Sequence, residues 1–190
     1  MTPDIKKVQR LIGTPQDGVW GPASERALDA ALAAQDGFDG SSAIPADYFV
    51  KLAKIESGTR PYVKASTSSA SGLYQFIRAT WLGEGGSWGQ DMTQAFGGLR
   101  PSTDEQTARA RTFTQKNADA LARAGVKVTD ASLYAAHFLG VGTAIRVLGQ
   151  PSNTPIEQVT SPDQRAANPS IIGPGKTVGD FTAWLARKVA

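Results

Sequence analysis

The sequence predicts a mainly α-helical protein in two parts, and three observations support this fold class. Apolar residues recur at helical spacing through most of the chain, strand signals are weak throughout, and a Gly/Ser/Asp-rich segment interrupts the pattern. That segment, at 37–43, separates a small module at 1–36 from a larger domain at 44–190. With 190 residues, 41% of them hydrophobic and 19% charged, the chain can bury a core.

The N-terminal module is predicted to form two short helices around a turn. Pro15-Gln16-Asp17-Gly18 is typical of a turn, and Pro22 suits the first position of the second helix. So small a piece cannot bury much apolar surface alone, so we expect it to pack on its neighbour or to be only marginally stable. The apolar positions of its helices are Ile5, Val8, Leu11 and Ile12, then Ala27, Leu28, Ala31 and Leu32.

The larger domain is predicted to be a series of helices joined by loops. Thr103 with Gln106 makes a capping-box pattern, and Asp130 is expected to cap the helix that follows it. Helices are expected from Pro45 to Ser57, from near Thr80, from Thr103 towards Gly125, from Asp130 to Gly140, around Ile145 and Leu148, and from Val178 through Phe181 and Trp184 to Leu185. The intervening segments are the Ser/Thr-rich 60–71, with room for a small hairpin, the Gly-rich 83–98, expected as loop or broken helix, and the Pro- and Asn-punctuated 152–175.

Composition excludes several kinds of chemistry. The chain has no cysteine and one histidine, which disfavours disulfides, a thiol nucleophile and a zinc site. Lys and Arg are scattered, so a net charge of +3 does not indicate a nucleic-acid partner. We expect no secretion leader and no membrane insertion, because the N-terminus lacks an apolar run and no stretch is long enough to span a bilayer.

Glu56 is the strongest candidate for a catalytic residue. Phe49, Leu52 and Glu56 fall at i, i+3 and i+7, which places the carboxyl group on or beside the apolar face of its helix. Glu56 also lies in the last turn before Gly58, where the helix dipole and partial burial both raise a carboxyl pKa. A general acid working near neutral pH requires a raised pKa. From spacing alone, however, a Glu at the edge of a solvated face is the stronger interpretation.

Two local motifs change that balance. Ile55-Glu56-Ser57-Gly58 is followed by Ala70-Ser71-Gly72-Leu73-Tyr74-Gln75-Phe76, and together they resemble the soluble lytic transglycosylase family. The family places its catalytic Glu in a Glu-Ser pair at a helix end, followed by a Gly-Leu-Met-Gln-type motif. Gly72, Leu73 and Gln75 match that motif, and Tyr74 replaces the Met. The resemblance covers roughly residues 44–150 and implies a lysozyme-like fold, α+β with minimal β.

The resemblance also implies which residues bind substrate. Gln75 and the backbone around Ser71 and Gly72 would hold the N-acetyl and hydroxyl groups of a glycan. Tyr74 would line the cleft, because an aromatic face suits a sugar ring, and Ser57 could form hydrogen bonds near Glu56. Phe76 and Trp81 are expected in the core.

A third family motif, usually Ala-Tyr-Asn-Ala-Gly, would fall at Ala136-His137-Phe138-Leu139-Gly140, where only the flanking Ala and Gly match. The family's Tyr, which lies close to the catalytic Glu, is His137 here. One hypothesis is that His137 orients Glu56 or acts as its pH-sensitive partner. The other is a core or rim histidine on an apolar helix face.

The N-terminal residues resemble a helical peptidoglycan-binding module. The resemblance rests on Asp17-Gly18-Val19-Trp20-Gly21-Pro22, which nearly completes the distinctive turn of that family. Trp20 is expected in the core of the module and not as a ligand contact. Such a module would tether the enzyme and raise its effective concentration at an insoluble polymer.

Together the resemblances imply a phage endolysin that cuts peptidoglycan between N-acetylmuramic acid and N-acetylglucosamine, with Glu56 as its one catalytic carboxylate. Ordinary glycoside hydrolysis uses two carboxylates, and neither Glu84 nor Asp91 falls in a second-carboxylate motif. A muramidase acting on the same bond and a non-catalytic wall-binding or virion protein stay open as alternatives. We expect a monomer without cofactor or metal that stays in the host cytoplasm until it is released to the cell wall.

Overall fold

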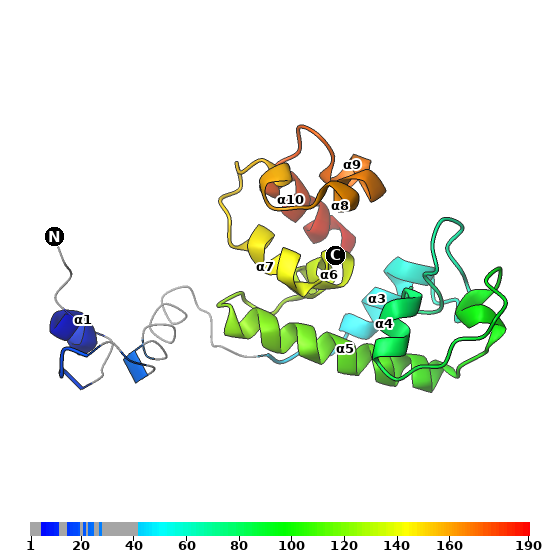
Figure 1. The fold of residues 1–190 in the computed structure, drawn as a ribbon, viewed down its shortest axis with the longest axis horizontal. Helices are drawn as coiled ribbons and strands as arrows, with labels where there is room; N and C mark the ends of the chain where they lie inside the picture. Colours follow the sequence, from blue (N-terminus) through cyan, green and yellow to red (C-terminus); the bar gives the residue numbers. More distant parts are fainter. Residues whose placement is uncertain (1–4, 12–14, 20, 22, 25–26, 28–41) are drawn as a thin grey trace.

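The computed structural model describes residues 5–11, 15–19, 21, 23–24, 27 and 42–190, and in these the chain is mainly helical (Figure 1). This confirms the mainly α class. The β structure of the described residues consists of isolated antiparallel bridges, Lys64 with Ser71, Ser71 with Phe76 and Pro155 with Thr177. The first bridge closes the small hairpin allowed for in segment 60–71, and the second extends the pairing to Phe76. No helix in the described part of the chain is both long and apolar enough to cross a bilayer.

The long helix α5 (Thr103–Arg123) organises the region after residue 42. It packs against α3 (Tyr48–Ser57), α6 (Asp130–Leu139) and α7 (Val141–Leu148), and α10 (Val178–Lys188) packs in turn on α6, α7 and α9 (Pro169–Ile172). Figure 1 shows α5 running beneath these helices. The remaining elements are α4 (Arg78–Gly83), α8 (Pro162–Ala167) and the 3-10 turns at Ala95–Gly98 and Ile156–Gln158.

The core of this region is continuous and rich in aromatic rings. Trp81 and Phe96 are fully buried, with ring centroids 4.7 Å apart, and Phe76 lies 5.9 Å from Trp81. The prediction that Phe76 and Trp81 are core residues is confirmed, because they are 3% and 0% exposed. Burial of large rings is a dominant contribution to folding free energy, so this cluster fixes the loops around α4.

Several predicted helix boundaries are wrong by a few residues. Helix α3 begins at Tyr48 and not at Pro45, because the backbone of residues 45–48 closes a tight turn, with the Tyr48 N–H donating to the Pro45 carbonyl at 3.1 Å. At the other end, Gly58 stops the helix as expected, in the left-handed conformation with φ 59°.

The caps of α5 and α6 lie one residue earlier than predicted. Ser102 caps α5, with its hydroxyl accepting from the Glu105 N–H at 3.1 Å, so the Thr103–Gln106 capping box does not form. Thr129 caps α6 in a reciprocal pair with Ser132. Asp130 is therefore free for another contact, described below.

Segment 152–175 contains helices that the sequence pattern did not predict. Ser161 and Asn168 each precede a proline, and these prolines open α8 and α9. Proline at the first helical position costs no hydrogen bond, so the punctuation by proline marks helix starts here and not only loops.

The N-terminal residues that can be described form a helix and a turn. Helix α1 spans Ile5–Leu11, and the buried Gln9 side chain donates to Asp17 Oδ1 at 2.7 Å and accepts from the Gly18 N–H at 2.9 Å. Gly18 has φ 77°, which favours glycine. The Asp-Gly turn is thereby confirmed. Trp20, Pro22 and most of the second helix and linker lie outside the described residues.

One ion pair joins the first turns of two helices. The Lys51 ammonium lies 3.0 Å from Asp47 at the start of α3 and 2.6 Å from Asp130 at the start of α6. The pair thus holds together the two helices that carry the residues discussed next.

Candidate functional site

Glu56 lies in the last turn of α3 and is mostly covered. Its side chain is 17% exposed. Burial raises the pKa of Glu56 above its ordinary value, while a hydrogen bond from the Tyr134 hydroxyl and the positive charge of Lys188 lower it, with burial dominating. The carboxyl group is therefore biased towards its protonated form while an edge stays accessible.

Helix α6 supplies two of the neighbours of Glu56. Tyr134 and His137 are one turn apart, so both side chains lie on the same face of the helix. The Tyr134 hydroxyl donates towards the Glu56 carboxyl group, and His137 Nε2 lies 3.9 Å from Glu56 Oε1. Burial raises the pKa of Tyr48, on α3, and the nearby charge of Glu56 raises it further. The site is thus a carboxyl group surrounded by aromatic and imidazole side chains.

His137 is packed within an aromatic cluster. Its ring stacks with Tyr134 at 6.3 Å and meets the edges of Phe76 and Phe113 at 6.3 and 6.2 Å. Burial lowers the pKa of His137 to about 4, with the backbone of Tyr74 acting in the opposite direction. The imidazole is neutral near pH 7 and forms no ion pair with Glu56 there. His137 thus combines both hypotheses, a packed core ring with one nitrogen facing Glu56, but it is no pH sensor near neutrality.

Ser57, Ser71 and Gly72 are buried, and their bonds are internal to the protein. The Ser57 hydroxyl donates to the Ala53 carbonyl at 3.0 Å. The Ser71 hydroxyl donates to the Ser69 carbonyl and accepts from the Phe96 N–H. Ser57 and Ser71 therefore use their hydroxyl groups to hold the backbone next to Glu56 and at the hairpin.

Tyr74 and Gln75 also differ from the expectation. Tyr74 is 4% exposed, with its ring edge-on to Phe49 and its hydroxyl paired with Thr107 at 3.1 Å, so the ring packs in the core and presents no open face for a sugar. Gln75 is half-buried and donates from Nε2 to the carbonyls of Gly72 and Val63. Its φ of 47° is unusual for a residue other than glycine, and such strain persists where the surroundings enforce it.

The other carboxylates considered from sequence are bound elsewhere. Glu84 pairs with Lys116 at 2.9 Å, and Asp91 accepts hydrogen bonds from Thr93 and Gln94 in its own turn. The charged group that shifts the pKa of Glu56 is Lys188. Within the described residues, no cluster of three or more His, Cys, Asp or Glu side chains could hold a metal.

Tyr134, Tyr48 and Lys188 were not predicted from sequence. Tyr134 precedes His137 by one helical turn, which is a usable signal once His137 is placed opposite Glu56. Lys188 lies far from Glu56 in the chain, and only the packing of α10 on α6 brings it near. The sequence contains no local pattern for such a contact.

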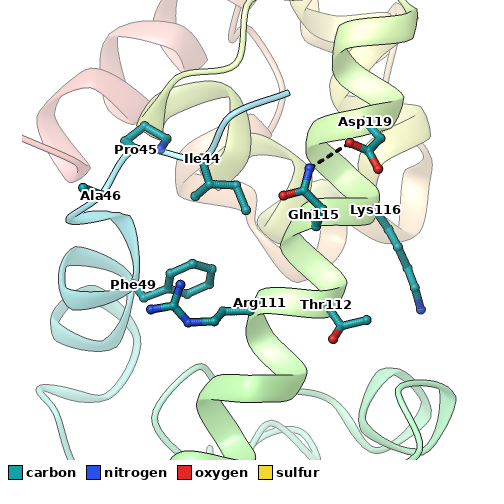
Figure 2. A pocket seen from close by; sticks show the side chains of 9 residues that line it. All are labelled: Ile44, Pro45, Ala46, Phe49, Arg111, Thr112, Gln115, Lys116 and Asp119. Atoms are coloured by element: carbon teal, nitrogen blue, oxygen red, sulfur yellow. Dashed lines mark hydrogen bonds between the residues drawn. The ribbon is translucent and has the colours of Figure 1, made fainter. Parts of the chain in front are cut away.

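A broad surface pocket lies between the start of α3 and the second half of α5 (Figure 2). The Arg111 guanidinium lies 4.7 Å from the centre of the Phe49 ring, and Gln115 donates to Asp119 at 2.8 Å. Glu56 is not among its lining residues. The pocket is therefore separate from the candidate site.

No known protein family matches the chain.

Proposed function

We propose that the chain cleaves peptidoglycan glycan strands between N-acetylmuramic acid and N-acetylglucosamine, with Glu56 as the catalytic acid. One observation carries the proposal: a carboxyl group 17% exposed, with its pKa raised by burial, next to the Tyr134 hydroxyl and His137. A protonated carboxyl group at an accessible edge is what general-acid cleavage of a glycosidic bond requires. The motifs around Glu56 and Gln75, which resemble the soluble lytic transglycosylases with their lysozyme-like fold, supply the substrate class.

The proposed reaction is a lytic transglycosylation. Glu56 gives its proton to the oxygen of the scissile bond, and the bond to the muramic C1 breaks. The resulting Glu56 carboxylate then takes the proton of the muramic C6 hydroxyl, whose oxygen closes a 1,6-anhydro ring on C1. Glu56 ends protonated as it began, and no water is consumed.

A single-carboxylate mechanism is favoured over a muramidase. A hydrolase of the usual kind needs a second carboxylate facing the same bond. Glu84 and Asp91 are engaged with Lys116 and with the Asp91 turn, which argues against that role. A wall-binding or virion protein without catalysis is the remaining alternative, and a partly covered acid with a raised pKa has no evident use in it.

The biological setting that we propose is phage-induced lysis. The protein would accumulate in the host cytoplasm as a monomer and reach the wall after a separate protein permeabilises the membrane. The N-terminal module would then tether it to the peptidoglycan.

The test is mass spectrometry of the soluble products that the wild type and Glu56→Gln release from purified peptidoglycan. We expect products ending in 1,6-anhydro-muramic acid from the wild type and none from the variant. Hydrated reducing ends at muramic acid would establish a muramidase instead. If neither protein releases products while both still sediment with the wall, the protein only binds.

A further inference from the structure

A second surface groove lies between α3 and the last turn of α10, the turn that carries Lys188. Helix α3 contributes Val50, Lys54 and Ile55 to it, and the last turn of α10 contributes Arg187 and Lys188. Ile55 precedes Glu56 in the chain. Val50 is 72% exposed, so the groove has an apolar side as well as a cationic one.

The groove has an excess of positive charge. Lys54, Arg187 and Lys188 are exposed, and among residues 42–190 none of them forms an ion pair within 4 Å. The charge of Lys51, which also lines the groove, is offset by Asp47 and Asp130. Among the described residues, no Asp or Glu side chain lines the groove, so its exposed cations leave a surface that attracts anions.

Two of these cations, Arg187 and Lys188, also stabilise helix α10. Arg187 and Lys188 lie at the negative end of the α10 dipole, and Lys188 lies 6.0 Å from the centre of the Trp184 ring. Lys54, however, lies on a different helix and converges on the same groove. Stabilisation of α10 does not account for that convergence.

We propose that this groove binds carboxylates of the peptide stem that the muramic acid next to the scissile bond carries, an inference that rests on the proposed function. Lys188 lines the groove and its charge acts on Glu56, so the groove lies within reach of a peptide stem several residues long on a strand bound at Glu56. The stem joins muramic acid through a lactyl group only a few bonds from the scissile carbon, and its amino acids bear free carboxylates. The chemistry on the two sides is therefore complementary in charge and position.

Binding of the stem would also act on Glu56. The charge of Lys188 lowers the pKa of Glu56. A stem carboxylate next to Lys188 offsets that charge, so the pKa of Glu56 rises further when a peptide-bearing strand is bound. The substrate itself then favours the protonated acid.

The first experiment measures binding to the full chain carrying Glu56→Gln, with a synthetic stem tetrapeptide as the probe and amide chemical shifts as the readout. We expect shifts in the 50–55 and 184–190 segments. The triple variant Lys54→Gln, Arg187→Gln, Lys188→Gln should bind more weakly by about two- to five-fold for each cation removed. The matched control is Arg123→Gln, Lys127→Gln, Arg146→Gln, which removes the same charge from exposed positions outside the groove and should bind as the parent does. Absence of peptide binding, or equal loss in the control, overturns the proposal.

The second experiment compares cleavage of intact peptidoglycan with cleavage of glycan strands stripped of their peptides. The double variant Lys54→Gln, Arg187→Gln, which spares Lys188 and its effect on Glu56, should lose kcat/KM on intact peptidoglycan and keep its rate on stripped strands. In the wild type, the alkaline limb of the pH profile should lie higher on the peptide-bearing polymer. Equal losses on both polymers overturn the proposal. If the wild type cleaves neither polymer, the proposed function fails, while peptide binding still decides the nature of the groove.

A third measurement addresses a different ligand class. Cosedimentation with phosphatidylglycerol vesicles, lost in the groove variant while cleavage of both polymers is unchanged, would mark the groove as a membrane-surface site and overturn the stem-peptide assignment.

Discussion

Burial acts in opposite directions on the two ionisable groups that face each other between α3 and α6. It raises the pKa of the Glu56 carboxyl group and lowers that of the His137 imidazole to about 4. In both cases the uncharged form is favoured, because a charged group loses hydration when it is buried. Burial therefore favours the neutral form of both groups, the protonated carboxyl group and the unprotonated imidazole.

A substitution of Tyr134 tests which contacts set the pKa of Glu56. Its hydroxyl hydrogen bond lowers the pKa of Glu56, so Tyr134→Phe should raise that pKa and move the alkaline limb of the activity profile to higher pH. A lower maximal rate is also expected if the hydroxyl orients the carboxyl group. Activity on peptidoglycan measured across pH checks this. Tyr62→Phe, at an exposed tyrosine bonded to the Pro101 carbonyl, is the control and should leave the profile in place.

His137 makes a prediction about stability. In the unfolded chain the imidazole takes up a proton near pH 6.5, whereas in the folded protein it does so only near pH 4. The unfolded state thus binds more protons in this window, and the free energy of unfolding should fall as pH drops through it, by on the order of 2–3 kcal/mol.

Urea denaturation from pH 7 to pH 4 measures this slope. In His137→Gln the contribution should disappear, so the stability difference between variant and wild type should shrink or reverse towards pH 4. Glu56 contributes a slope of its own in both proteins, and the difference between them cancels it. A constant difference across pH would show that the imidazole is not buried as a neutral group.

At the scale of single residues, the sequence predicts the position of the Glu56 side chain but not the positions of the side chains around it. The helical spacing from Phe49 and the Gly58 stop place the carboxyl group at a partly covered helix end, and the structure confirms that placement, where burial raises the pKa of Glu56. The predicted roles of Ser57 and Tyr74 depended on side-chain direction. Direction is decided by packing against Phe49 and by bonds to backbone carbonyls, neither of which a linear motif records.

At the scale of the elements, the helix caps decide where α5 and α6 begin. The sequence offers Ser102 and Thr103 as adjacent candidates for the cap of α5. The backbone selects Ser102, which is extended with ψ 158°, because only an extended residue can turn its side chain back onto the free N–H groups. Gln106 then lies inside the helix, fully buried, and accepts from the Leu73 N–H at 2.8 Å. Because the sequence pattern assigned Gln106 to a capping box, it did not predict the hydrogen bond by which Gln106 joins α5 to the hairpin.

The cap assignment gives a direct stability test. Ser102→Ala should lower the free energy of unfolding by about 1 kcal/mol, because the Glu105 N–H loses its acceptor. Thr103→Ala, one residue along and also exposed, should change it by less than about 0.5 kcal/mol. Chemical denaturation of the two variants decides between the caps. The reverse order would restore the box predicted from the sequence.

At the scale of the whole molecule, close approaches between distant segments hold the site region together. Gly72 lies where the hairpin meets α5 and the loop around Phe96. A Cβ atom added there would lie 2.4 Å from both Gln106 Oε1 and the Phe96 ring, and φ is already 81°. These contacts join segments that are far apart in the chain. The helical pattern predicted the elements on either side but could not predict which residues meet.

Gly72→Ala should therefore destabilise the protein by about 3 kcal/mol or more, through a clash added to backbone strain. Gly58→Ala is the control, because its φ of 59° and ψ of 38° are those of an ordinary left-handed residue and no atom lies within 4 Å of the added Cβ. It should cost only about 1 kcal/mol, from the backbone alone. Thermal and urea unfolding of both variants measure the difference. Equal losses would mean that the crowding at Gly72 is relieved at no cost.

The ion pairs of Lys51 with Asp47 and Asp130 fix the relative position of the two helices that carry the candidate site. They fasten α3 and α6 at their first turns, whereas Glu56 and His137 project from their last turns. Because helices are stiff, a small change in the angle between α3 and α6 at the Lys51 ion pairs displaces their last turns, which lie on the order of 10 Å away. The contacts of Lys51 thus help to set the separation between the carboxyl group and the imidazole, although Lys51 touches neither of them. We expect substitutions of Lys51 to change the position of Glu56 relative to His137, although no residue beside Glu56 is replaced.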